Sequence, residues 1–172
     1  MKKQIKNFII DVDGVLTTGQ FFYSKDGKVY KVFGPDDSDV LNLIKETINI
    51  HMITGDKRGF DISQKRVVED MKFPLALVST FGRVKWIKEK FDLKKTIYMG
   101  DGIFDSLVFK EVGYSIAPAN AFQRTKDLAD FVTKKRGGEG AVAEACFHIM
   151  TKFFKPMDID NMSFKKGVGI WK

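Results

Sequence analysis

Short apolar runs alternate along the chain with longer segments in which apolar residues recur every three or four positions. The short runs are typical of buried strands, and the recurring pattern is typical of amphipathic helices. Runs rich in Ile, Val and Phe predict strands at residues 8–11, 50–54, 75–78, 96–99, 114–117 and 130–132. Segments of helical period predict helices at residues 38–48, 59–71, 84–91, 103–111, 121–128 and 141–153. This alternation predicts an α/β fold with a mostly parallel central sheet.

The connection after the first predicted strand has a different pattern. Residues 20–33 contain two β-prone runs on either side of Lys25-Asp26-Gly27. An Asp-Gly pair between such runs favours a tight turn joining two antiparallel strands. We therefore expect a β-hairpin after the first strand and before the first helix.

Two carboxylates, Asp11 and Asp13, follow the first predicted strand directly. They lie at the carboxyl end of a buried strand, where open α/β sheets bind their ligands. If Asp11 still belongs to the strand, the two side chains begin on one face, and Gly14 permits a sharp turn. One carboxylate could then attack while the other transfers a proton. The alternative is an ordinary polar turn, because Asp-Gly turns are common.

Other predicted strand and helix ends carry residues suited to phosphate or metal. Thr54 and Gly55 offer a hydroxyl and exposed amides, although Thr-Gly is also an ordinary turn. Lys85 adds a cation near the start of a helix, although a lone lysine there is usually solvated. Asp101 and Asp105 follow the fourth strand, and a hard divalent cation relieves the repulsion of crowded carboxylates. Acidic N-caps explain either aspartate singly, but not the recurrence of such residues at the strand ends.

Composition narrows the classes of function. The 172 residues suit one domain, and 44% hydrophobic content excludes wholesale disorder. Cys146 is the only cysteine, which excludes an intramolecular disulfide and a Cys-based zinc site. The net charge of +7 comes from scattered lysines without a nucleic-acid-binding motif, so it favours small phosphorylated substrates. No apolar run approaches the roughly 20 residues that span a bilayer, and no signal peptide is recognisable, so we expect a cytoplasmic protein without membrane or nucleic-acid partners.

The order Asp-Val-Asp-Gly-Val at residues 11–15, Thr54, Lys85 and Gly-Asp-Gly-Ile-Phe-Asp at residues 100–105 resembles the motifs of the haloacid dehalogenase superfamily. The resemblance extends from residue 8 to about residue 153. It implies a three-layer, Rossmann-like fold and phosphoryl-transfer chemistry. The first and fourth motifs are specific, whereas the Thr and Lys motifs persuade only by their order.

The resemblance also implies roles for individual residues. Asp11 would be the nucleophile that forms an aspartyl-phosphate, and Asp13 would be the general acid and base. Thr54 and Lys85 would hold the transferring phosphoryl oxygens, with Gly55 beside them. The interval between Lys85 and the fourth motif is short for the family, which leaves two neighbouring cations as alternatives, Arg83 and Lys88.

The implied cofactor is Mg²⁺. Its direct ligands would be Asp11, the backbone carbonyl of Asp13 and Asp101. Asp105 would support the metal indirectly, from outside these ligands or through a water molecule.

The spacing of the motifs leaves no room for a cap domain. Residues 14–53 are taken up by the hairpin and one βα unit, and residues 55–84 by a helix, a strand and a turn. The chain thus looks most like the capless branch that hydrolyses 3-deoxy-octulosonate 8-phosphate or nonulosonate 9-phosphates. Shared features are the hairpin and Arg-Gly-Gly-Glu-Gly-Ala-Val at residues 136–142. This resemblance implies a homotetramer in which a neighbouring subunit covers each site.

The sequence offers several candidate specificity residues. The octulosonate enzymes tend to have Arg-Asp-Gly after the hairpin, whereas this chain has Asp36 where the arginine is expected. Asp37 is interpreted either as a ligand of substrate hydroxyls or as the N-cap of the next helix. Arg136 is interpreted either as the counter-ion of a substrate carboxylate or as part of a flexible loop. Further specificity candidates follow the second strand, namely Asp56, Lys57 and Arg66.

We therefore predict one phosphatase domain over residues 1–153 and an apolar tail, residues 154–172, that packs on a neighbouring subunit. The predicted function is Mg²⁺-dependent hydrolysis of a sugar-acid phosphate. The alternatives are a non-catalytic assembly module of sugar-acid activation and a receiver-like phosphoacceptor domain. A receiver places its acidic pair and its acceptor on different strands, and a scaffold does not need both Asp11 and Asp13.

Overall fold

The computed structural model describes residues 4–161 and is organised around a six-stranded parallel sheet. The strands follow the predicted positions to within about two residues: β1 (Asn7–Asp11), β4 (Asn49–Thr54), β5 (Leu75–Leu77), β6 (Thr96–Met99), β7 (Tyr114–Ala117) and β8 (Phe131–Val132). Their order is β5-β4-β1-β6-β7-β8, and every neighbouring pair is parallel. The carboxyl ends of all strands therefore lie along one edge of the sheet.

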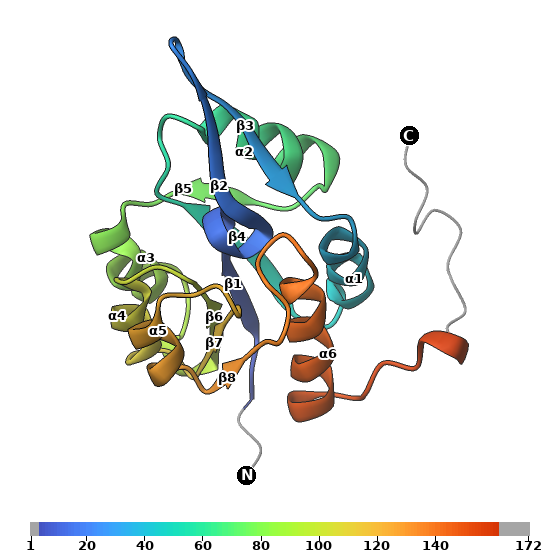
Figure 1. Ribbon diagram of the computed structural model, residues 1–172. Coiled ribbons are helices and arrows are strands. Elements are labelled where there is room, and N and C mark those ends of the chain that lie inside the picture. Colours follow the sequence, from blue (N-terminus) through green and yellow to red (C-terminus); the bar gives the residue numbers. More distant parts are fainter. Residues whose placement is uncertain (1–3, 162–172) are drawn as a thin grey trace.

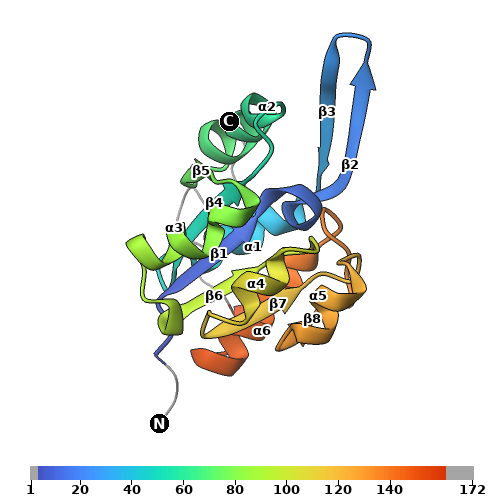
Figure 2. The same cartoon turned by 90° about the vertical axis from the view of Figure 1, so that its left-hand side faces the viewer.

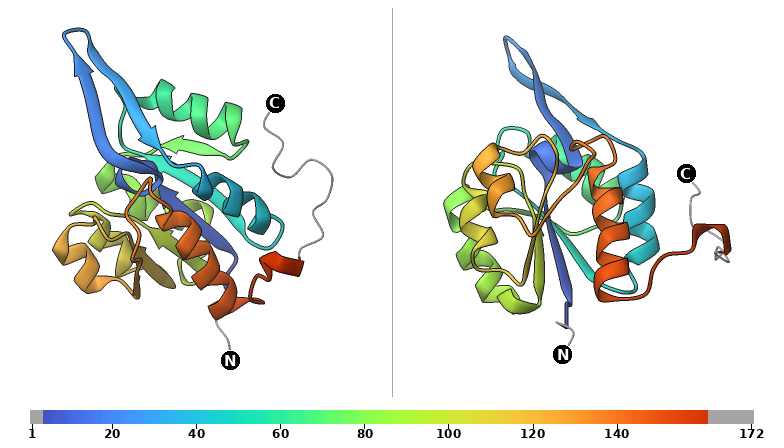
Figure 3. Two further views of the ribbon diagram at one scale, coloured as in Figure 1. Left: turned by 45° about the vertical axis from the view of Figure 1, so that its right-hand side comes forward. Right: turned by 60° about the horizontal axis from the view of Figure 1, so that its bottom comes forward.

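Helices cover both faces of this sheet, which gives the predicted three layers (Figure 1 and the right-hand view of Figure 3). One layer contains α1 (Asp36–Ile44), α6 (Ala141–Phe153) and the segment formed by α2 (Phe60–Gln64) and η2 (Lys65–Asp70). The other contains α3 (Arg83–Lys90), α4 (Asp105–Phe109) and α5 (Gln123–Leu128). Short turns complete the chain: η1 (Val12–Leu16), η3 (Thr80–Gly82), η4 (Leu93–Lys95) and η5 (Ile159–Asn161).

The central strand β1 shows why the sheet needs two covering layers. Phe8 and Ile10 belong to the core beneath α1 and α6, whereas Ile9 belongs to the core beneath α3 and α4. All three side chains are fully buried. An unbroken apolar run is typical of a strand that is covered on both faces.

The hairpin projects away from the main sheet (Figure 2). Strands β2 (Thr17–Ser24) and β3 (Gly27–Phe33) pair with each other in a separate antiparallel sheet, as the Asp-Gly turn predicted. The hairpin exposes several large apolar side chains: Phe21, Phe22, Tyr23, Val29, Tyr30 and Val32.

The chain beyond α6 is described only as far as residue 161. Phe154 and Met157 pack against the core beneath α6. Ile159 is 41% exposed, and the apolar residues beyond 161 lie outside the described residues. Packing of the tail on another subunit therefore stays a prediction, as does the boundary at residue 153. Among residues 4–161, no helix has the length and apolar character needed to cross a membrane.

Candidate active site

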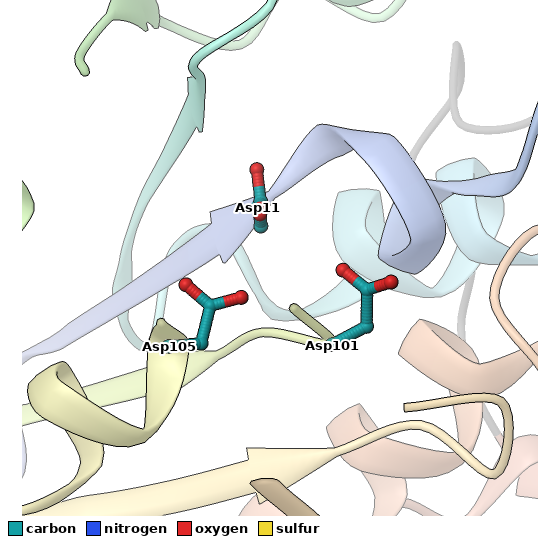
Figure 4. A group of neighbouring side chains, drawn as sticks. All are labelled: Asp11, Asp101 and Asp105. Atoms are coloured by element: carbon teal, nitrogen blue, oxygen red, sulfur yellow. The ribbon is translucent and has the colours of Figure 1, made fainter. Parts of the chain in front are cut away.

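Three carboxylates meet at the carboxyl edge of the sheet (Figure 4). Asp11 ends β1, Asp101 follows β6, and Asp105 begins α4. One oxygen from each lies within 4.8 Å of the others. The sequence predicted this meeting from two strand ends, and it follows because β1 and β6 are neighbours in the sheet.

The cluster is electrostatically suited to a divalent cation. Burial raises the pKa of Asp101 to about 7, and the charge of Asp105 contributes to the increase. Burial also raises the pKa of Asp11 well above its ordinary value, although the Arg83 charge opposes this. A cation among these oxygens would offset their repulsion and their loss of water. The donors are carboxylates only, and such hard ligands suit Mg²⁺.

Gly14 makes this arrangement possible. Its φ is +85°, a left-handed conformation that glycine adopts without strain. A Cβ at this position would lie 2.0 Å from the Asp101 Oδ2 atom. Asn120 secures the turn, since its amide donates to the Gly14 carbonyl at 2.8 Å and its oxygen accepts from the Gly137 amide at 2.6 Å. The chain therefore turns sharply after β1 and closes over Asp101.

Asp13 lies on this turn, and both of its carboxylate oxygens have partners. The Thr54 hydroxyl donates to Oδ2 at 2.7 Å, and the Lys31 ammonium lies 2.7 Å from Oδ1. Thr54 ends β4, the strand beside β1, so the structure places it next to Asp13 as the sequence suggested. Gly55 follows it and is exposed. The expected acid–base carboxylate and phosphate-binding hydroxyl are thus in direct contact.

The predicted phosphate-binding cation requires a correction. The Lys85 side chain is 82% exposed and lies 3.8 Å from Glu89 on the outer face of α3, so the prediction of Lys85 is wrong. Arg83 occupies the site instead, with its guanidinium 2.7 Å from Asp11 Oδ2 and ion-paired with Asp105. Arg83 was one of the two alternatives that the sequence left open, the other being Lys88, and it is 6% exposed.

Two predicted substrate contacts do not lie at this site. Asp37 is buried in the first turn of α1, and its Oδ1 accepts from the Ala143 amide of α6 at 2.9 Å. It therefore caps α6, and the interpretation as the N-cap of α1 is wrong, because Pro35 precedes α1 without a side-chain cap. Asp37 does not line the pocket, and its contact with substrate stays a prediction. Arg136 is exposed and does not line the pocket, so its contact with substrate stays a prediction.

A cavity of about 310 Å³ opens over the cluster. Its floor is charged, with Asp11, Asp101 and Arg83, whereas its rim is formed by Phe21, Ile103 and other apolar or small residues. The whole lining consists of Asp11, Asp13, Gly19, Phe21, Thr80, Arg83, Asp101, Gly102, Ile103, Phe104 and Asp105. The site can therefore bind an anionic group at its floor and a larger group above it.

Comparison with known proteins identifies the family. The family model of the haloacid dehalogenase-like hydrolases matches residues 86–145. The 3-deoxy-D-manno-octulosonate 8-phosphate phosphatase of Salmonella typhi is 31% identical over 154 residues, which make up 84% of this chain and 78% of the relative. This chain belongs to the haloacid dehalogenase-like phosphatases.

Solved structures support the same assignment. The octulosonate phosphatase of Moraxella catarrhalis, in complex with a magnesium ion, a phosphate ion and KDO, has a TM-score of 0.73 and 29% identity over 87% of this chain and 88% of that one. The cobalt-bound octulosonate phosphatase of Haemophilus influenzae has the same TM-score and 28% identity, over 87% and 90% of the two chains. The predicted family and fold are thereby confirmed.

Sequence reasoning missed several residues that shape the site of this phosphatase. Lys28 and Lys31 reach it from the hairpin, and both pair with Asp56. The Tyr98 hydroxyl, fully buried on β6, donates to Asp105 Oδ1 at 2.7 Å and accepts from Arg83. A polar tip between Ile97 and Met99 was a signal for Tyr98, because a buried phenol needs a partner. For Lys28 and Lys31 alternation gave no signal, because residues three apart lie on opposite faces of a regular strand, and the hairpin register is irregular between them.

Proposed function

We propose that this phosphatase hydrolyses phosphate monoesters of sugar acids through an aspartyl-phosphate on Asp11, with Mg²⁺ as cofactor. The observation that carries the proposal is the meeting of Asp11, Asp101 and Asp105 beneath one cavity, with Asp13 and Arg83 beside them. This set supplies a nucleophile, a metal site, a proton-transfer group and a cation for the phosphoryl oxygens.

In the first step, a carboxylate oxygen of Asp11 forms a bond to phosphorus and the bond from phosphorus to the ester oxygen breaks. Asp13, as a carboxylic acid, gives its proton to the departing alkoxide. In the second step, Asp13 takes a proton from water while the water oxygen attacks phosphorus. The bond between phosphorus and Asp11 then breaks, which returns Asp11 as a carboxylate and releases inorganic phosphate.

The remaining groups stabilise charge and hold geometry. Arg83 and the Thr54 hydroxyl would donate to the phosphoryl oxygens, where negative charge is spread in the transition state. Asp11, the backbone carbonyl of Asp13, Asp101 and Asp105 would hold Mg²⁺, which neutralises charge on the same oxygens. Burial of the cluster strengthens each of these interactions, because a low local dielectric screens charges poorly.

The substrate class rests on relatives and on charge. The relatives named above are phosphatases of 3-deoxy-D-manno-octulosonate 8-phosphate, and one of them was solved with KDO. The net charge of +7 favours approach of anionic substrates. Asp36, where those enzymes tend to have arginine, weakens the octulosonate assignment, so the proposal includes nonulosonate 9-phosphates.

Assembly as a homotetramer is part of the proposal. Six large apolar side chains of the hairpin are more than a third exposed, from Val29 at 37% to Tyr30 at 66%. Such a patch on a projecting hairpin suits contact with another copy of the chain. A neighbouring subunit would then complete the cavity above Asp11, where Arg136 or the tail could meet the sugar acid.

The test is release of inorganic phosphate from octulosonate 8-phosphate, nonulosonate 9-phosphates and simpler sugar phosphates. We expect turnover that depends on Mg²⁺, disappears with EDTA and falls at least about 1,000-fold in Asp11→Asn, because the nucleophile is lost. Asp36→Asn, at an exposed position outside the pocket, is the matched control and should retain turnover. No release from folded, metal-bound protein would favour the assembly module, and a long-lived acyl-phosphate without turnover would favour the receiver-like domain.

A further inference from the structure

Lys31 of the hairpin is a buried cation in direct contact with Asp13. Its side chain is fully buried, and its ammonium lies 2.7 Å from Asp13 Oδ1 and 2.9 Å from Asp56 Oδ2. It also donates to the Ser63 hydroxyl oxygen on α2 at 2.8 Å. The contact with Ser63 is a hydrogen bond, whereas those with the two carboxylates are ion pairs. These three contacts fix the position of the ammonium.

The hairpin buries Lys31, although solvation favours an exposed lysine. In β3, Tyr30 is 66% and Val32 is 41% exposed, whereas Lys31 between them is 8% exposed. Alternation along a strand puts neighbours on opposite faces, and here the apolar pair faces outward while the cation faces the domain. Burying an ammonium is costly unless it is paired, and the pairing here is with the carboxylates of Asp13 and Asp56. The hairpin therefore places a charge at the site.

We propose that Lys31 is a positioning residue for Asp13, and that it holds Oδ1 so that Oδ2 carries the proton to and from the reacting oxygens. The proposal rests on the acid–base role of Asp13 proposed above. It assigns the two carboxylate oxygens of Asp13 different roles: Oδ1 pairs with Lys31, and Oδ2 accepts from the Thr54 hydroxyl.

The contacts of Thr54 give the sequence of events. Without substrate, the Thr54 hydroxyl donates to Asp13 Oδ2 at 2.7 Å. When a phosphoryl group binds, that hydroxyl turns to its oxygens, and Oδ2 loses its partner. Lys31 is then the remaining contact that keeps the Asp13 carboxylate aligned with the ester oxygen. A misplaced general acid slows the reaction most when the leaving group most needs a proton.

The experiment compares esters with different leaving groups. A sugar phosphate leaves as a basic alkoxide that needs the proton of Asp13, whereas p-nitrophenyl phosphate leaves as a stable phenolate that scarcely needs it. We expect Lys31→Met to lower kcat/KM about 10-fold to 100-fold on the best sugar phosphate and only about twofold on p-nitrophenyl phosphate. Equal losses on the two esters, or no loss on either, would overturn the proposal, because a merely structural role has no preference for the leaving group.

Lys28→Met is the matched control. Lys28 lies on the same strand and pairs with the same Asp56, but no contact joins it to Asp13 among the described residues. We expect it to leave the ratio between the two esters unchanged. A ratio that shifts equally in both variants would mean that Asp56, and not Asp13, mediates the effect, which also overturns the assignment.

Two further measurements cover the remaining outcomes. If Lys31→Met does not fold, Ser63→Ala removes one acceptor while leaving the ammonium, and a smaller shift of the ratio in the same direction is expected. If the wild-type protein hydrolyses neither ester, the proposed function fails; crystal structures of Lys31→Met and Lys28→Met then test the positioning alone. Displacement of the Asp13 carboxylate in Lys31→Met only supports the assignment, and an unmoved carboxylate contradicts it.

Discussion

Replacing Arg83 and Lys85 separately by methionine tests which cation serves the phosphoryl group. The two residues lie in the same turn of α3 and both become an apolar side chain of similar length. The structure places them in opposite environments: Arg83 is 6% exposed against Asp11 and Asp105, and the Lys85 side chain is 82% exposed. The two substitutions therefore compare nearby positions of one helix that lie in different environments.

The contacts of Arg83 and Lys85 set the expected changes in the free energy of unfolding and in kcat. Loss of one partner from a buried ion pair destabilises a fold by about 3–5 kcal/mol, because the other charge stays buried and uncompensated. Mg²⁺ offsets part of this loss for Asp11 and Asp105, so the free energy of unfolding should fall less in Mg²⁺ than in EDTA. Removing a donor aimed at developing charge costs about 2.7–4 kcal/mol, or 100-fold to 1,000-fold in kcat. For Lys85 the exposed pair with Glu89 contributes at most about 1 kcal/mol.

The assay is kcat/KM on the best sugar phosphate at saturating Mg²⁺, together with urea unfolding in Mg²⁺ and in EDTA. We expect Arg83→Met to lose at least about 100-fold in kcat/KM and Lys85→Met to stay within about twofold. Arg83→Lys keeps a cation without the planar fork and should fall between wild type and Arg83→Met. The reasoning is refuted if Lys85→Met loses as much activity as Arg83→Met, or if Arg83→Met keeps wild-type kcat/KM.

Two predictions concern protons. Burial, with the charge of Asp105, raises the pKa of Asp101 to about 7, so a proton competes with Mg²⁺ below that pH. The Mg²⁺ association constant, measured by calorimetry, should fall up to about tenfold per pH unit below about pH 7 and level off above it; a flat profile would contradict the cluster as the metal site. Burial raises the pKa of Asp37 from 3.8 to about 6 despite the Ala143 hydrogen bond, so the folded chain binds this proton more tightly than the unfolded chain. The free energy of unfolding should therefore fall by about 3 kcal/mol as pH rises from about 4 to about 6, and urea unfolding of Asp37→Asn should lack this contribution, whereas equal slopes would argue against it.

The carboxylate cluster was predictable because it depends on topology. Parallel strands deliver their carboxyl ends to one edge, so Asp11 and Asp101 could be expected to meet once the strands were recognised. Strand recognition in turn was simple, because residues 8–10 form an unbroken apolar run, as a doubly covered strand requires. Placement by topology tolerates errors of one or two residues in the bounds of an element.

The cation that lies beside Asp11 was not predictable in the same way, because it depends on the phase of a helix. Successive residues of an α-helix are about 100° apart, so Lys85 lies roughly 200° around α3 from Arg83. The predicted helix started at residue 84, whereas α3 begins at Arg83. An uncertainty of that size is unimportant for a strand end but decides which side chain of the first turn faces Asp11. The sequence could offer both cations and could not choose between them.

The hairpin lysines required knowledge of what the hairpin faces. Alternation shows that Tyr30 and Lys31 lie on opposite sides of β3, but it does not show which side meets the domain. The usual inference, that apolar side chains face inward, would bury Tyr30 and expose Lys31. The structure has the reverse, because Asp13 and Asp56 present carboxylates to that side and a buried pair of charges of one sign needs a cation. The arrangement that brings Lys31 to Asp13 is therefore also the one that turns the apolar side chains of Tyr30 and Val32 outward.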